Sequence, residues 1–106
     1  MITLEDFLKI ELKVAQIVEA KLHPNADKLL LLTVDTGTER KEIVAGIALH
    51  YAAAELVGKK VILVNNLQPA TLRGVVSSGM LLAAHDGASL SLVTPERSVA
   101  TGAIVR

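Results

Sequence analysis

An alternation of apolar and polar residues near the N-terminus constrains the fold of this chain more than any other feature. Between residues 10 and 22, apolar side chains recur at every second position over most of the run, and charged residues such as Glu11 and Lys13 stand between them. A period of two matches a strand that buries one face, whereas an amphipathic helix needs a period of 3.6. The pattern predicts a long strand whose buried face consists of Ile10, Leu12, Val14, Val18, Ala20 and Leu22.

The remainder of the chain predicts further strands around one helix. The turn-forming residues 23–27 precede an apolar run at 28–35, which is typical of a strand covered on both faces. Thr36-Gly37 then reverses the chain into a hairpin with an exposed, charged tip. An Ala-rich stretch at 48–56, ending before Gly58, predicts a helix. The other predicted elements are a short helix from Thr3 to Lys9 and strands at 39–45, 60–67, 79–84, 90–93 and 103–105.

Three strands, a helix and then at least two strands is the element order of a five-stranded barrel of the oligonucleotide/oligosaccharide-binding (OB) type. Closing the sheet also removes the exposed strand edges that so β-rich a chain would otherwise present. At 106 residues the chain is long enough for one domain and too short for a second site-bearing one. We therefore expect an all-β fold: a five-stranded OB barrel with one or two short helices and with N- and C-terminal extensions, spanning residues 1–106 as a single domain.

The charge of the chain is balanced overall but unevenly distributed. It carries 11 basic and 11 acidic residues, yet the first 58 residues have a net charge of −3 and the remainder a net charge of +3. The run from Leu56 to Ala84 contains Lys59, Lys60 and Arg73 and no carboxylate. Uncompensated positive charge predicts a surface for a polyanion, with RNA as the leading candidate.

Composition argues against several classes of site. With no cysteine, the chain cannot form disulfides or thiolate metal sites, and this composition fits a reducing compartment. The three histidines lack metal-ligand spacing and no nucleotide-binding P-loop motif is present, so no cofactor or metal is expected. No apolar run approaches the roughly 18 residues of a membrane span, and the N-terminus lacks the basic start of a secretion signal. We expect a cytoplasmic, non-enzymatic protein that does not bind membranes.

The mode of RNA recognition follows from the scarcity of aromatic residues. Phe7 and Tyr51 are the only two, whereas single-strand binders stack bases on aromatic rings. We therefore expect recognition of backbone shape in a structured RNA. The 51% hydrophobic content is also high for so small a body, which predicts that the chain associates with itself.

Several short segments, in order along almost the whole chain, resemble one known family. They are Phe7 with Leu12-Lys13-Val14, residues 23–29 (HPNADKL), 44–48 (VAGIA), 55–60 (ELVGKK), Asn66-Leu67, Arg73-Gly74 and 77–80 (SSGM). The family is the tRNA-binding domain, found as small dimeric bacterial proteins that bind tRNA structure-specifically and as the C-terminal domain of methionyl-tRNA synthetase. The resemblance implies an OB barrel that binds the outer, convex side of folded tRNA without catalysis. It also implies a homodimer built from N- and C-terminal segments, and a synthetase catalytic domain as a further partner.

The resemblance also assigns an RNA-facing set by position. Its members are Lys28, Asn66, Arg73, Ser77 and Met80, with Lys59 and Lys60 nearby. In this assignment Lys28 and Arg73 neutralise phosphates, and Asn66 hydrogen-bonds sugar or phosphate. Ser77 offers its hydroxyl or the adjacent backbone N–H, and Met80 offers an adaptable apolar contact.

One departure from the family pattern bears on affinity. After the Asn-Leu turn, where relatives usually carry Lys or Arg, this chain has Gln68, Ala70 and Thr71, so the charge there falls mainly on Arg73. Each lost phosphate contact lowers the log–log salt slope by roughly one. We expect weak tRNA binding with a shallow salt dependence.

Two other functions fit parts of the sequence. The apolar excess suits a chaperone-like, peptide-binding OB dimer of the kind associated with protein export. Asp35-Thr36-Gly37 matches the tripeptide of aspartic proteases, in which two Asp35 carboxylates at a dimer axis would share a proton. The same tripeptide is also a common hairpin turn, and that interpretation is favoured here.

Overall fold

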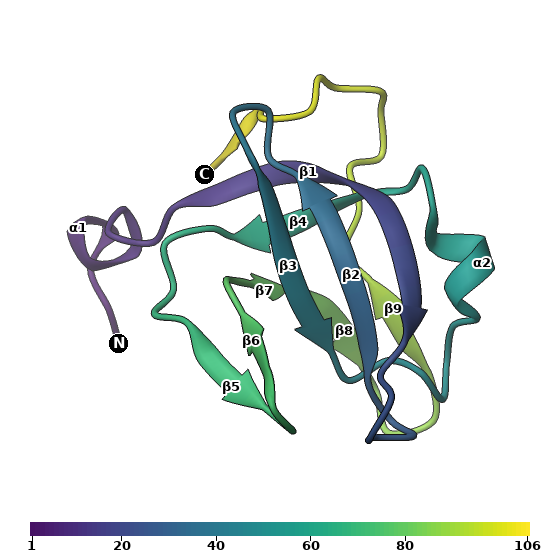
Figure 1. Cartoon of the computed structure of the whole chain (residues 1–106). Helices are drawn as coiled ribbons and strands as arrows, with labels where there is room; N and C mark the ends of the chain where they lie inside the picture. Colours follow the sequence, from purple (N-terminus) through teal and green to yellow (C-terminus); the bar gives the residue numbers. More distant parts are fainter.

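The computed structural model describes all residues from 1 to 106 (Figure 1). Ten strands and two single-turn helices make up the chain. In order they are α1 (Leu4–Phe7), β1 (Leu12–Leu22), β2 (Leu30–Asp35), β3 (Arg40–Ala45), α2 (Ala53–Leu56), β4 (Lys60–Val64), β5 (Ala70–Leu72), β6 (Val75–Ser77), β7 (Met80–Leu81), β8 (Ala83–His85), β9 (Leu90–Leu92) and β10 (Ile104–Val105). Neither helix has the length or the apolar character that crossing a membrane requires.

Five strands form a nearly closed barrel in the order β3-β2-β1-β4-β7, all antiparallel. β3 and β7, at the two ends of this order, lie against each other and bring the sheet round on itself. α2 lies between β3 and β4 in the chain and packs on β1, while β10 adds to the outer end of β1 (Figure 1). The predicted all-β class and five-stranded OB barrel are confirmed.

The interior of the barrel is entirely aliphatic. Twelve buried residues share one cluster: Ala15, Ile17, Leu30, Leu32, Val34, Ile43, Ala45, Ile47, Leu56, Val61, Leu63 and Leu92. Leu56 brings α2 into this cluster and is fully buried, so the single helical turn closes one end of the barrel. Packing of this kind stabilises a small domain mainly by removing apolar surface from water.

β1 buries both of its faces, which corrects the predicted single apolar face. Ala15 and Ile17 point into the barrel, whereas Leu12 and Val14 belong to a second buried cluster on the opposite side of the strand. The register with β2 shifts between Ile17 and Glu19, so the alternation changes phase there. Two residues of the predicted face are exposed instead: Ile10 and Leu22.

Two local predictions differ from the structure. β2 alternates between buried and half-buried residues, so only one of its faces is in the core. The predicted helix at 48–56 is reduced to α2, because the Glu55 carboxylate accepts the Ala52 backbone N–H and starts the helix there. The hairpin tip at residues 37–40 is exposed and charged as predicted, although Thr36 next to it is fully buried and a Cβ on Gly37 would lie 2.9 Å from the Gly102 Cα.

A hairpin of β5 and β6 was not anticipated from the sequence. Arg73 and Gly74 link its strands with φ values of 51° and 87°. Two consecutive positive φ angles define the two-residue type I′ turn that matches the twist of a hairpin. All three residues of β5 are exposed, so the hairpin lacks the alternation that marks a half-buried strand.

Candidate nucleic-acid interface

Lys28 and Arg73 lie at the same end of the barrel. Lys28 is exposed in the β1–β2 connection, and Arg73 is exposed at the tip of the β5–β6 hairpin (Figure 1). A hydrogen bond joins the two segments: His23 Nε2, from the connection, lies 3.2 Å from the carbonyl oxygen of Leu72, which precedes Arg73. The two segments that carry the predicted phosphate-binding residues are therefore joined by tertiary structure.

His23 holds the two segments in a defined arrangement because both ring nitrogens are engaged. Its side chain is buried, and its Nδ1 accepts the Asn25 backbone N–H at 3.0 Å. Since Nδ1 accepts, Nε2 carries the proton and donates to the Leu72 carbonyl. The imidazole thus positions the cationic loops and stays out of contact with solvent.

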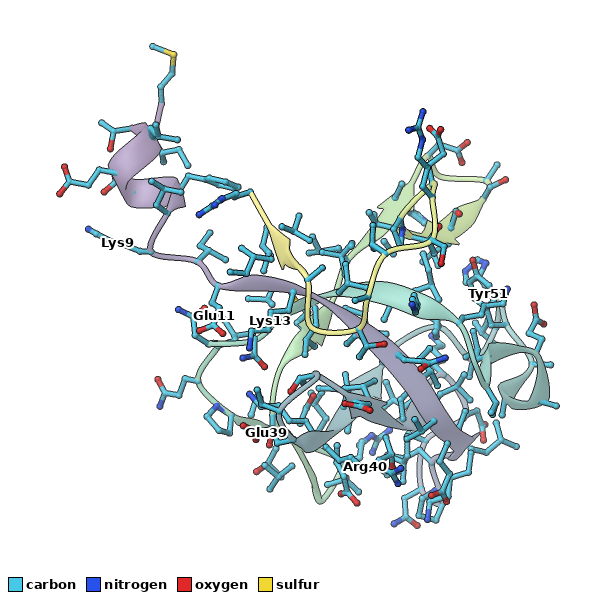
Figure 2. The ribbon with its side chains drawn as sticks, turned by 90° about the horizontal axis from the view of Figure 1, so that it is seen from above. Lys9, Glu11, Lys13, Glu39, Arg40 and Tyr51 are labelled. Carbon is cyan, nitrogen blue, oxygen red and sulfur yellow. The ribbon has the colours of Figure 1, made fainter.

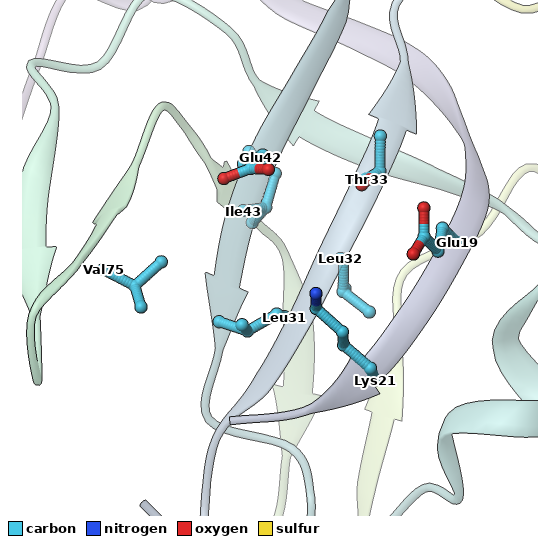
Figure 3. A pocket seen from close by; sticks show the side chains of 8 residues that line it. All are labelled: Glu19, Lys21, Leu31, Leu32, Thr33, Glu42, Ile43 and Val75. Carbon is cyan, nitrogen blue, oxygen red and sulfur yellow. The ribbon is translucent and has the colours of Figure 1, made fainter. Parts of the chain in front are cut away.

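A groove beside this end sets a limit on where RNA can lie. It has a volume of about 370 Å³ and runs over the outer face of β1, β2 and β3 towards Val75 of β6. Figure 3 shows Glu19 and Glu42 on either side of Thr33, with the Lys21 amine lower in the groove. The two carboxylates repel phosphate, so the strand face favours RNA only near Lys21. Lys21 was not among the predicted site residues, although it adds a third cation to the Lys28–Arg73 end.

Ser77 forms hydrogen bonds at the barrel seam, the line along which β3 meets the β6–β7 segment. Its buried hydroxyl accepts the Val44 backbone N–H at 2.9 Å and donates to the Gly79 carbonyl at 3.0 Å. The next residue, Ser78, donates its backbone N–H to the Glu42 carbonyl at 2.9 Å. Both groups that the sequence assigned to RNA, the hydroxyl and the adjacent N–H, are therefore occupied in joining β3 to the β6–β7 segment.

Asn66 anchors the N-terminal segment. Its Oδ1 accepts the Glu11 backbone N–H at 2.8 Å, and its Nδ2 donates to the Lys9 carbonyl at 2.8 Å. The side chain thus mimics a strand partner for residues 9 to 11. An RNA contact through the same amide would have to use its remaining donor and lone pair.

Next to this clamp, charged groups surround Glu11. Asn65 Nδ2 donates to Glu11 Oε1 at 2.9 Å, and the Lys13 amine lies 3.5 Å from the same oxygen (Figure 2). Lys41 donates to the Asn65 carbonyl at 2.8 Å and adds a further positive charge. The hydrogen bond from Asn65, followed by the interactions with Lys13 and Lys41, holds the pKa of Glu11 below its ordinary value.

Met80 belongs to an apolar face beside α1. A groove of about 470 Å³ is lined there by Phe7, Lys9, Ile10, Leu12, Val64, Asn66, Leu67, Met80 and Leu82. Leu67 and Met80 remain 46% and 47% exposed within it. We refer to these residues as the apolar face. Its chemistry suits an apolar partner better than a phosphate backbone.

Lys59 and Lys60 lie in a third region, where α2 leads into β4. The Lys59 amine stands 5.7 Å from the centre of the Tyr51 ring, and the Lys60 amine donates to the Val99 carbonyl. Tyr51 is half-buried and its hydroxyl accepts the Leu92 backbone N–H at 3.0 Å. With a cation over its ring, Tyr51 offers no open platform for a base. Apart from the buried Ser77, the predicted residues thus occupy three separate regions.

The sequence matches the family model described as "Putative tRNA binding domain" over residues 12–104. This chain belongs to the tRNA-binding-domain family. It is 51% identical over 104 residues to a methionine–tRNA ligase of Thermotoga maritima, a match covering 98% of this chain and 16% of that protein. A methionine–tRNA ligase of Pyrococcus horikoshii is 52% identical over 102 residues, covering 96% and 14%. The domain therefore spans less than a fifth of the length of these relatives.

Solved structures share the fold of this tRNA-binding domain. A protein of P. horikoshii described as MetRS-related superposes with a TM-score of 0.94 at 36% identity, covering 100% of this chain and 98% of that chain. A CsaA chaperone protein of Picrophilus torridus superposes with a TM-score of 0.92 at 31% identity, covering all of both chains. The barrel, the β5–β6 hairpin and the C-terminal segment all fall inside these superpositions.

In the tRNA-binding domain, Asp35 serves the hairpin turn. Its Oδ1 accepts the Gly37 backbone N–H at 2.8 Å, and the Thr36 hydroxyl bonds with the Glu39 backbone. These are the interactions by which Asp and Thr stabilise tight turns. The sequence similarity to aspartic proteases at this tripeptide therefore has a local structural explanation.

Proposed function

We propose that this chain is a non-catalytic tRNA-binding domain that recognises the shape and phosphate backbone of folded tRNA. The proposal includes a cytoplasmic location and an existence either as a free protein or as the appended domain of a methionyl-tRNA synthetase. Family membership and the similarity to methionine–tRNA ligases support the ligand class. The engaged ring of Tyr51 and the half-buried Phe7 support recognition of backbone over stacked bases.

The observation that supports the proposal is that the segments carrying the exposed Lys28 and Arg73 are joined at one end of the barrel. The ion pairs within the chain are Lys9–Asp6 and Lys13–Glu11, so no carboxylate neutralises either cation through an ion pair. Unpaired cations release counterions from RNA when they contact phosphates, which is the main source of affinity for a nucleic-acid backbone. With Lys21 nearby, the end presents three cations to one ligand.

The small number of cations determines how strongly the domain binds. Gln68, Ala70 and Thr71 lie on or next to the exposed β5 strand and add no charge. The two or three phosphate contacts at this end contribute about −2 to the log–log salt slope. Binding should therefore be weak at physiological salt and measurable at low salt.

The test replaces both cations and measures tRNA affinity over a series of salt concentrations. Lys28→Ala is combined with Arg73→Asn, because Asn tolerates the positive φ of 51° at this turn position and Ala does not. The double variant should reduce the magnitude of the salt slope by about two and weaken tRNA binding at low salt. The matched control, Arg40→Asn, removes an exposed cation from β3 and should keep the slope. Equal slopes for the double variant and the wild type would refute this interface.

Homodimerisation through the apolar face is the second part of the proposal. Exposed Leu67 and Met80 adjoin the N-terminal segment, and burying them against a second copy removes apolar surface from water. Leu67→Asp should convert a dimer to a monomer in sedimentation velocity. Val57→Asp is the control, because Val57 is also exposed, at 54%, but follows α2. A wild-type protein that sediments as a monomer at micromolar concentration would contradict this assembly.

A second candidate function is chaperone-like binding of unfolded polypeptide. The same apolar groove and the similarity to the CsaA chaperone protein of P. torridus favour it. A competition experiment separates the two functions, with reduced, unfolded polypeptide added to a complex with labelled tRNA. If polypeptide binds and Leu67→Asp abolishes that binding while tRNA affinity stays unchanged, the chaperone function holds for the apolar face. If polypeptide does not bind, the chaperone candidate is rejected.

A further inference from the structure

A polar notch lies between the start of β4 and the segment that follows β9. It is shallow, about 380 Å³ in volume, and none of its lining residues is hydrophobic. The lining consists of Lys59, Lys60, Thr94, Pro95, Glu96, Arg97 and Ser98. Two segments more than thirty positions apart in the sequence therefore build one concave surface without apolar character.

The notch concentrates positive charge. Lys59, Lys60 and Arg97 contribute three cations against the single carboxylate of Glu96. Neither of the ion pairs within the chain involves any of these residues. Thr94 and Ser98 add exposed hydroxyls that can donate hydrogen bonds. A cluster of this composition matches a tetrahedral oxyanion, because a guanidinium can bind two of its oxygens while ammonium groups neutralise the charge.

Backbone hydrogen bonds hold one wall of the notch in place. Gly58 donates its N–H to the Ile17 carbonyl at 2.7 Å, and Ile17 donates its N–H to the Lys59 carbonyl at 2.9 Å. The Lys60 amine bonds to the Val99 carbonyl and so connects this wall to the opposite segment. Since these hydrogen bonds fix the backbone of this wall before a ligand arrives, little backbone entropy is lost there on binding.

We propose that this notch binds a phosphate group, and that in the tRNA complex inferred above, on which this inference rests, the group is a backbone phosphate. Lys60 pairs with Gln16 of β1, and the Lys28–Arg73 end lies beyond Leu22, six residues further along that strand. At about 3.3 Å per residue, the two cationic regions are separated by about 20 Å along the path of β1. One folded RNA contacts both, and the notch fixes the orientation of the RNA on the barrel.

The experiment measures the salt dependence of tRNA binding for three full-length variants. Arg97→Ala should reduce the magnitude of the salt slope by about one, and the double variant Lys59→Ala/Arg97→Ala should reduce it by about two. Each should weaken tRNA affinity at low salt severalfold. Arg97→Lys should keep the slope, because it retains the charge. Arg40→Ala, which removes an exposed arginine from β3 (Figure 2), is the matched control and should bind as the wild type does. Backbone amide NMR spectra establish that each variant is folded.

A second measurement distinguishes binding of an RNA backbone phosphate from binding of free inorganic phosphate. Backbone amides of residues 58–60 and 94–98 are followed by NMR during titration with tRNA and with inorganic phosphate alone. Shifts with tRNA together with the lowered slope support the proposal. The RNA assignment of the notch is overturned if only inorganic phosphate shifts these amides. It is also overturned if Arg97→Ala leaves the salt slope unchanged while Lys28→Ala/Arg73→Asn makes it shallower. In both cases the proposed function stands. If the wild-type protein binds no tRNA, both the RNA assignment of the notch and the proposed function are refuted.

Discussion

Replacing Ser77 by alanine should loosen the barrel seam without removing an RNA contact. The Ser77 hydroxyl is the acceptor for the Val44 backbone N–H and a donor to the Gly79 carbonyl, and both Ser77 and Val44 are buried. Alanine fits the space but can neither accept the Val44 N–H nor donate to the Gly79 carbonyl. The Val44 N–H is then left inside the protein without a partner, next to the line where β3 meets the β6–β7 segment.

The expected cost follows from these two bonds. An unsatisfied buried N–H costs roughly 1–3 kcal/mol, and the lost bond to Gly79 adds about 0.5–1.5 kcal/mol. A total of about 2–4 kcal/mol is a large part of the roughly 5–15 kcal/mol that separates a folded domain from its unfolded chain. For a domain near 100 residues this corresponds to a fall in Tm on the order of 10–20 °C.

Thermal and urea unfolding, followed by circular dichroism, test this value against a neighbouring control. Ser78→Ala keeps the backbone N–H that donates to Glu42 and loses only a half-buried hydroxyl, so its stability should change by less than about 0.5 kcal/mol. At a temperature where both variants are folded, tRNA affinity should stay within about twofold of wild type. A Ser77→Ala protein with an unchanged Tm and a tenfold weaker tRNA complex would refute the seam argument and restore the hydroxyl as an RNA contact.

Three further predictions concern the extensions of the barrel. Gly102→Ala should destabilise the fold more than Gly87→Ala in thermal unfolding: both have φ near +92°, but a Cβ on Gly102 meets the Thr36 carbonyl at 3.0 Å and one on Gly87 meets nothing within 4 Å. Glu11→Gln should flatten the acid side of the stability profile. Because the folded pKa of Glu11 lies below 4.5, its contribution is present above the unfolded pKa and is lost as the pH falls through the folded pKa, which urea titrations from pH 6 to 3 would measure. Asn66→Ala should speed amide hydrogen exchange at Glu11, and unchanged exchange would contradict the clamp.

Local sequence patterns were sufficient for the barrel strands and for the type of fold. The first three strands were predicted to within about two residues, because alternation, turn residues and β-branched runs are local signals. The phase change in β1 was not predictable, since the bulge near Ile17 depends on which neighbours cover each face. The β5–β6 hairpin was missed because its exposed strand has no apolar period, although Arg73-Gly74 between short β-forming runs is a turn signal.

The sequence by itself determined the all-β architecture and the family, because both depend on residue order and on motifs read along the chain. Only the tertiary structure decided what the individual polar residues do. The segments that carry Lys28 and Arg73 are joined through His23, whereas Ser77 and Asn66 use their hydrogen-bonding groups on the protein itself. The physical reason is that a polar side chain binds whichever partner folding brings within about 3 Å, and residues distant in sequence supply that partner.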